Sequence, residues 1–201
     1  MGNFKYLSKP TRSVLKKILI LVFQYPRYIK YKLLSNCNQI IGKPRLNQPL
    51  QINGKGKVIF HQNVTIGVDP SPFLYSGYAY IDSRKEFSKI EIGKNCWINN
   101  NFVAIAEGDG IEIKENVLIG SSCEILDSDF HNLNPDKRIG GAAITNKVII
   151  NESVFIGSNV KILKGVNIGR NSVIAAGSVV TKSIPENVIA GGIPARVMRQ
   201  L

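Results

Sequence analysis

An aliphatic residue recurs at every sixth position through the last third of the chain, and this period constrains the fold more than any other feature. The series is unbroken from Ile150 to Val180, and a series of valines from Val148 to Val166 runs two residues ahead of it. A helix places its apolar residues three and four positions apart, so helical periodicity does not generate this pattern. Each hexapeptide is expected to form one short strand followed by one corner.

Three such hexapeptides close one triangular coil, and successive coils pair edge to edge at the parallel-strand spacing of about 4.8 Å. Residues three repeats apart then lie above one another in the core. The predicted stacked pairs are Ile150 with Ile168, Ile156 with Ile174, and Ile162 with Val180. β-Branched side chains suit such a flat stacked core.

The same step appears earlier in two other frames, from Ile92 to Ala104 and from Ile113 to Ile125. A solenoid accommodates extra residues between frames as loops that leave a corner, and such loops commonly carry function. We expect loops at 68–88 and 127–146, and the second contains His131. Their residues are expected to determine the specificity of any site that these loops help to form.

The charge is concentrated at one end of the chain. The net charge is +12, yet residues 1–68 contain twelve Lys or Arg and no acidic residue, and the remainder is balanced. This asymmetry favours a basic arm that meets an anionic surface. We therefore expect residues 1–48 to form a basic, partly helical arm or cap, and residues 49–201 to form the repeat domain.

Residues 11–34 are expected to form one or two amphipathic helices with a break at Pro26. The apolar run 18–23 is much shorter than the roughly 20 residues of a spanning helix and lacks the cleavage site of a signal peptide. One interpretation is a cap over the open end of the solenoid. The other is peripheral contact of residues 1–45 with an anionic membrane. No nucleic-acid motif accompanies the charge, so nucleic acid is not an expected partner.

The three cysteines, Cys37, Cys96 and Cys123, form no CxxC pair and no disulfide framework. A reducing, cytoplasmic location fits them best, and the basic arm would hold the protein at the inner face of the membrane. Ser122 and Glu124 offer no cation or base to lower the pKa of Cys123, so we interpret Cys123 as an inward or corner residue and not as a nucleophile.

The segment from Val154 to Pro185, followed by Gly-Gly-Ile-Pro-Ala-Arg-Val at 191–197, resembles the hexapeptide-repeat acyltransferases, specifically the sugar O-acetyltransferases. The resemblance covers roughly residues 90–201. It implies an all-β fold, a left-handed parallel β-helix, here preceded by an α-helical segment. It also implies a homotrimer that binds acetyl coenzyme A between neighbouring subunits and carries a catalytic histidine on a projecting loop.

Carried over residue by residue, the resemblance assigns the catalytic role to His131 and an acceptor-binding role to Asn99. The positions similar to coenzyme contacts in the family are Ser158, Ala176, Thr181, Lys182, Arg196 and Arg199. Basic side chains near the last coils suit the phosphates of the coenzyme. No metal is expected.

A sugar hydroxyl is a weak nucleophile at neutral pH, and a side chain whose pKa lies near 7 is the best base for its proton. His131 fits this role. Asp127 or Asp129 is expected to accept the other ring N–H and fix the tautomer, and the Ser158 amide is a candidate donor to the oxyanion. His61 has no comparable support and is expected to be a surface residue.

We therefore expect acetyl transfer from acetyl coenzyme A to a saccharide hydroxyl, in the biosynthesis of a bacterial surface polysaccharide such as capsule, O-antigen or exopolysaccharide. One alternative is N-acetylation of a nucleotide-linked amino sugar. Another is a solenoid that serves as a non-catalytic scaffold, since a fold does not determine a function. A zinc carbonic anhydrase on this solenoid would need three histidine ligands, and the chain has two.

Overall fold

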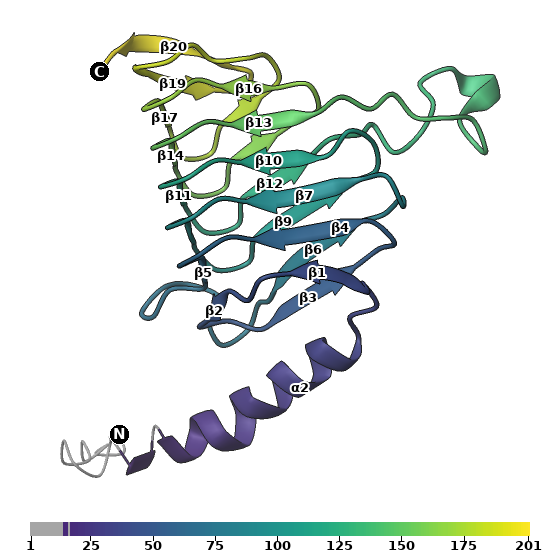
Figure 1. Cartoon of the computed structure of the whole chain (residues 1–201). Helices are drawn as coiled ribbons and strands as arrows, with labels where there is room; N and C mark the ends of the chain where they lie inside the picture. Colours follow the sequence, from purple (N-terminus) through teal and green to yellow (C-terminus); the bar gives the residue numbers. More distant parts are fainter. Residues whose placement is uncertain (1–13, 16) are drawn as a thin grey trace, which may run out of the picture.

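The computed structural model describes residues 14–15 and 17–201 of the chain. Figure 1 shows a column of stacked strands, a helix at its N-terminal end and a long loop that leaves the column. The helical elements are η1 (Ile20–Gln24, a π-helical stretch), α2 (Tyr25–Leu33) and the 3-10 turn η2 (Pro135–Lys137) in the long loop. Of the helical segment expected over 11–34, residues 11–13 and 16 lie outside the described part.

The strands form three sheets, which we call A, B and C, and each coil of the chain visits A, B and C in turn. Sheet A contains β1 (Gln39–Ile41), β4 (Lys57–Phe60), β7 (Lys89–Ile92), β10 (Ile111–Ile113), β13 (Val148–Ile150) and β16 (Asn167–Ile168). Sheet B contains β2 (Arg45–Leu46), β5 (Thr65–Ile66), β8 (Trp97–Ile98), β11 (Leu118–Ile119), β14 (Phe155–Ile156), β17 (Val173–Ile174), β19 (Val188–Gly192) and β20 (Ala195–Gln200). Sheet C contains β3 (Leu50–Asn53), β6 (Ala79–Ser83), β9 (Val103–Ala106), β12 (Glu124–Leu126), β15 (Lys161–Ile162) and β18 (Val179–Val180).

The registers of neighbouring strands confirm the stacking that the six-residue period predicts. Ile150 pairs with Ile168, Ile156 with Ile174, and Ile162 with Val180. All six side chains are fully buried. The earlier frames join the same columns, because Ile113 pairs with both Ile92 and Ile150. The frame slips therefore change only the length of the connections, and one continuous core runs through the prism.

Asparagine supplies many of the corners. Asn95, Asn116 and Asn159 have φ angles of 58° to 59°, in the left-handed region that asparagine tolerates better than most residues. The amide of Asn95 also donates to Oδ1 of Asn116 at 3.1 Å, one coil above. These corners turn the chain while the side-chain amides bond from coil to coil.

The solenoid begins earlier than residue 49, where the sequence analysis placed the boundary. β1 and β2 pair in parallel with β4 and β5, so they already belong to the first coil. These short segments form strands through backbone hydrogen bonds to the next coil, although their apolar pattern is weak. Among the described residues, the part outside the solenoid at the N-terminal end consists of the helix and the connection to β1.

The segment 68–88, expected to be a loop, is divided by β6, a strand with buried side chains that pairs with β3 and β9. The irregular part before β6 is held by the buried side chain of Asn100, whose amide donates to the carbonyls of Val68 and Pro72 at 3.0 and 2.9 Å. The part after β6 is a turn that carries Arg84. The expected loop 127–146 is present in full between β12 and β13.

Candidate active site

Most of the predicted site residues occupy two corners of the prism, and Arg196 and Arg199 lie on β20 of sheet B. We call the turns that follow strands of sheet B the B–C corner, and the turns that follow strands of sheet C the C–A corner. Asn99, Ser158 and Ala176 lie at the B–C corner, and His131, Thr181 and Lys182 lie at the C–A corner. Within the described part of the chain, no hydrogen bond or ion pair joins the two sets.

His131 lies on the 127–146 loop, which leaves the C–A corner and extends away from the column (Figure 1). Its imidazole is exposed, and its ring Nδ1 lies 3.4 Å from the carbonyl oxygen of Arg138. Further along, the side chain of Asn134 accepts a hydrogen bond from the Asp136 amide at 3.0 Å and caps η2. The imidazole is therefore accessible for proton transfer.

The base of this loop is held by Asp127, whose side chain is buried. Its Oδ1 accepts from the amide of Glu107 at 2.7 Å, and its Oδ2 accepts from the amides of Gly108 and Gly110, each at 2.9 Å. Its carbonyl accepts from the amide of Asn146 at 2.9 Å, which closes the two ends of the loop. Both carboxylate oxygens thus serve the neighbouring turn and not His131. In this structure, Asp127 holds the loop in place.

Asp129 faces the solenoid as well. Its Oδ2 lies 3.2 Å from Nζ of Lys164 and is buried without an aligned hydrogen-bond donor. Its backbone amide donates to the carbonyl of Ile144 at 3.1 Å. Within the described residues, no hydrogen bond joins either predicted carboxylate to His131, whose ring is hydrogen-bonded to the loop's own backbone.

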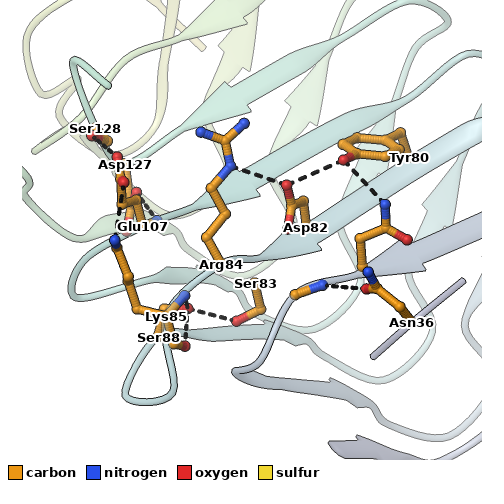
Figure 2. Close-up of polar contacts among 12 residues, drawn as sticks. Asn36, Tyr80, Asp82, Ser83, Arg84, Lys85, Ser88, Glu107, Asp127 and Ser128 are labelled. Carbon is orange, nitrogen blue, oxygen red and sulfur yellow. Dashed lines mark hydrogen bonds and ion pairs between the residues drawn. The ribbon is translucent and has the colours of Figure 1, made fainter. Parts of the chain in front are cut away.

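Figure 2 shows a polar cluster beside this base that sequence reasoning did not identify. The hydroxyl of Ser128 donates to Glu107 at 3.0 Å and accepts from the amide of Phe130 at 2.9 Å. Phe130 itself has φ of +61°, which is unfavourable for a bulky side chain. The guanidinium of Arg84 lies over its ring, with Cζ 4.8 Å from the centroid. These contacts fix the residue that directly precedes His131.

The guanidinium of Arg84 is itself held from the other side. Its Nε donates to Asp82 at 3.0 Å, and the same carboxylate oxygen accepts from the hydroxyl of Tyr80 at 3.1 Å. Burial raises the pKa of Tyr80, so this hydroxyl stays a donor at neutral pH. The only sequence signal for the cluster was the Arg84-Lys85 pair inside a segment expected to govern acceptor choice.

At the B–C corner, Ser158 and Ala176 lie one coil apart. A Cβ built on Gly157 would lie 2.5 Å from the backbone nitrogen of Ala176, so only glycine permits this close approach. The Ser158 hydroxyl accepts from the backbone amide and the hydroxyl of Ser121, each at 3.2 Å. The amide of Ser158 has no acceptor within the described part of the chain and is available as a hydrogen-bond donor.

Asn99 belongs to the same corner, two coils below Ser158. Its side-chain oxygen accepts from the amide of Asn100 at 2.7 Å, which fixes the side chain and leaves its NH2 group as a donor. Lys182 and Arg196 are exposed, and the described residues provide no carboxylate partner for Lys182, Arg196 or Arg199. Three cations near the last coils are thus free to meet an anion.

The other titratable candidates have structural surroundings. His61 is exposed and its Nε2 lies 2.8 Å from Glu91, as expected for a surface residue. Cys37, Cys96 and Cys123 are buried and form no disulfide, and burial raises the pKa of Cys123 to about 11. Among residues 14–15 and 17–201, no group of three metal-ligating side chains is found.

Comparison with known proteins agrees with this architecture. The bacterial transferase hexapeptide model (six repeats) matches residues 147–182. The galactoside O-acetyltransferase of Escherichia coli K12 is 35% identical over 157 residues, which cover 77% of this chain and 72% of that protein. The galactoside O-acetyltransferase of Lactococcus lactis is 39% identical over 59% of this chain, and the match spans 65% of its length, just under two thirds.

Among solved structures, a hexapeptide-repeat-containing acetyltransferase of Vibrio cholerae, complexed with acetyl coenzyme A, is similar. It is 28% identical, with a TM-score of 0.56 over 90% of this chain and 79% of that chain. The all-β, left-handed parallel β-helix expected from the sequence is confirmed.

Proposed function

This chain belongs to the hexapeptide-repeat acetyltransferase family, and from that premise we propose that it transfers an acetyl group from acetyl coenzyme A to a hydroxyl group of a saccharide. The observation that carries the proposal is the exposed imidazole of His131 on a loop whose base is fixed by the buried carboxylate of Asp127. A loop anchored in this way places an accessible proton acceptor at a defined position without burying it.

In the proposed reaction, His131 removes the proton of the acceptor hydroxyl as its oxygen attacks the thioester carbonyl. The tetrahedral intermediate then collapses and releases the coenzyme thiolate, which takes the proton from the imidazolium. The unoccupied amide of Ser158 supplies a donor for the oxyanion. Lys182, Arg196 and Arg199 attract the phosphates of the coenzyme.

We infer that the complete site forms between subunits of a homotrimer. Asn99 and Ser158 lie at one corner of the prism and His131 lies at another, on a loop that projects outward (Figure 1). A threefold arrangement can place the C–A corner of one subunit against the B–C corner of the next, and one interface then contains both sets of residues. The outward loop supports this arrangement.

The exposed side chains of the N-terminal helix support peripheral binding of the protein to a membrane. Residues 18–23 are all apolar and their exposed fractions range from 38% at Ile20 to 65% at Leu21. Successive helical residues point about 100° apart, so this stretch is apolar on every side, and a rigid neighbour could cover only one side. The described part of the chain contains no helix long and apolar enough to cross a bilayer.

Basic and aromatic side chains follow this apolar stretch. α2 carries exposed Lys30, Lys32 and Tyr25, a combination that suits the headgroup region of an anionic bilayer, whereas Arg27 donates to the carbonyl of Gly77. Other side chains of α2 contact the solenoid, because Tyr31 stacks on Tyr78 with the ring centroids 4.1 Å apart. We infer that the enzyme works at the cytoplasmic face of the membrane on a surface-polysaccharide intermediate.

A screen of acceptors distinguishes the candidate functions. Release of the coenzyme thiol is measured with neutral sugars, acidic sugars, amino sugars, nucleotide-linked sugars and fragments of surface glycans. Release that depends on a hydroxyl acceptor supports O-acetylation, and release only with a nucleotide-linked amino sugar supports N-acetylation instead. Silence with every acceptor, together with no binding of acetyl coenzyme A, would leave the non-catalytic scaffold.

A further inference from the structure

A polar cleft lies at the N-terminal end of sheet C, close to the base of the His131 loop. We call it the β6 cleft. Its lining residues are Asn36, Asn53, Gly54, Lys55, Asp82 and Arg84. Its volume is about 470 Å³, within the usual range for sites that hold a small ligand. Amide, carboxylate and cationic groups in one cleft are the partners that a saccharide with its hydroxyls requires.

Two cations of this cleft are available to a ligand. Nε of Arg84 is bonded to Asp82, and the side chain is 40% exposed. Its two terminal nitrogens have no partner among the described residues, and Figure 2 shows them pointing away from the other labelled side chains. Lys55 is exposed and forms no ion pair within the described part of the chain. The lining of the cleft therefore contains two cations and one carboxylate.

Arg84 connects the cleft with the catalytic loop. One face of its guanidinium lies over the ring of Phe130, whose backbone leads directly to His131. The guanidinium is planar and held at Nε by Asp82, so its terminal nitrogens form a fixed fork that matches a carboxylate or a phosphate. An anion bound by this fork would lie at the edge of the loop that carries the proposed base.

We propose that the β6 cleft binds an anionic group of the saccharide acceptor, a carboxylate or a phosphate, through Arg84 and Lys55. This inference rests on the proposed acetyltransferase function and narrows its acceptor to acidic saccharides. The nearby amides of Asn36 and Asn53 bind the hydroxyls of the same sugar unit. The glycan is thereby oriented with a neighbouring hydroxyl towards His131.

The test uses three sugars that share one pyranose ring, namely methyl glucoside, methyl glucuronide and glucose 1-phosphate. Binding of each to the full chain is measured by calorimetry, and thiol release from acetyl coenzyme A is measured separately. The charged sugars should bind at least about tenfold more tightly than methyl glucoside. The preferred charged sugar identifies whether the site takes a carboxylate or a phosphate.

The variants are Arg84→Gln, Lys55→Gln and, as a matched control, Lys57→Gln, an exposed lysine on β4 that does not line the cleft. Arg84→Gln should weaken binding of the charged sugar by about 10- to 100-fold and leave methyl glucoside unchanged. Lys55→Gln should weaken it several-fold, and Lys57→Gln should not. The oligomeric state of Arg84→Gln in solution, measured by light scattering, should be that of the wild type.

The two proposals fail in different ways. Equal binding of all three sugars, absence of binding, or an equal loss for charged and neutral sugars in Arg84→Gln would overturn the cleft assignment. A changed oligomeric state of Arg84→Gln would overturn it too, since Arg84 would then belong to a subunit interface. Tight binding of charged sugars without thiol release from any acceptor would keep the cleft and contradict the acetyltransferase function.

Discussion

Oδ2 of Asp127 lies 2.9 Å from the backbone nitrogen of Gly110, and this contact joins the His131 loop to the turn one coil below. Gly110 has φ of +96°, a conformation that glycine adopts readily, and a Cβ there would lie 2.1 Å from the carbonyl oxygen of Lys89. The turn is thus shaped so that its amides converge on one buried carboxylate. The loop depends on this carboxylate for its position.

Replacing Asp127 with asparagine should destabilise the protein. The substitution removes charge-assisted bonds from three amides and turns an NH2 group towards a donor, which costs about 2–4 kcal/mol of unfolding free energy. Thermal melting of Asp127→Asn is compared with Asp136→Asn, an exposed carboxyl on the same loop. Equal melting temperatures for the two variants and the wild type would contradict the anchoring role.

The thiols of Cys96 and Cys123 should not react with thiol reagents in the native protein. Burial raises the pKa of Cys96 and of Cys123 to about 11, so at pH 8 only roughly one thiol in a thousand is a thiolate. We expect neither cysteine to react with a chromogenic disulfide reagent until the chain is unfolded with guanidinium. Mass spectrometry of the labelled protein locates the reacted thiols, and rapid labelling of Cys96 or Cys123 in the native state would contradict the burial described.

The sequence predicted the repeating part of the fold well because each coil depends on local, periodic burial. The stacked pairs Ile150 with Ile168, Ile156 with Ile174, and Ile162 with Val180 follow from the six-residue spacing. β1 and β2 were missed because their side chains are mostly exposed, so no apolar alternation marks them. Their strand character comes from backbone pairing with later coils.

The site was less predictable for a physical reason. His131 stands out because it lies in a frame slip. The partners of Asp127, in contrast, are backbone amides 20 and 19 residues earlier in the chain, and no side-chain pattern reveals them. The contact between Arg84 and Phe130 joins two segments that only the stacking of coils brings together. A sequence motif does not encode such contacts between corners.

The helix should mediate binding to anionic vesicles. Leu21→Glu combined with Phe23→Glu removes two exposed apolar side chains and adds two negative charges, so co-sedimentation with phosphatidylglycerol vesicles should weaken at least about 100-fold. Ile139→Glu, an apolar-to-acidic change at an exposed position of the 127–146 loop, serves as the control. Unchanged sedimentation of the double variant would contradict membrane contact through this helix.

The location of the site between subunits predicts complementation. His131→Ala disables the C–A corner and Asn99→Ala disables the B–C corner, so each homotrimer should have low activity. In trimers formed by co-expression of equal amounts, about a quarter of the interfaces combine two intact corners, and a similar fraction of wild-type activity should return. Activity no higher than the mean of the two single variants would place both residues in a site within one chain.

The most direct test of the proposed chemistry compares the two histidines of the chain. Thiol release from acetyl coenzyme A with the best acceptor is measured for the wild type, His131→Ala and His61→Ala, the last being an exposed histidine paired with Glu91. We predict that His131→Ala lowers kcat by about 10²- to 10⁴-fold while acetyl coenzyme A still binds, and that His61→Ala is unchanged. A His131→Ala variant that retains the wild-type kcat would contradict the assignment of His131 as the general base.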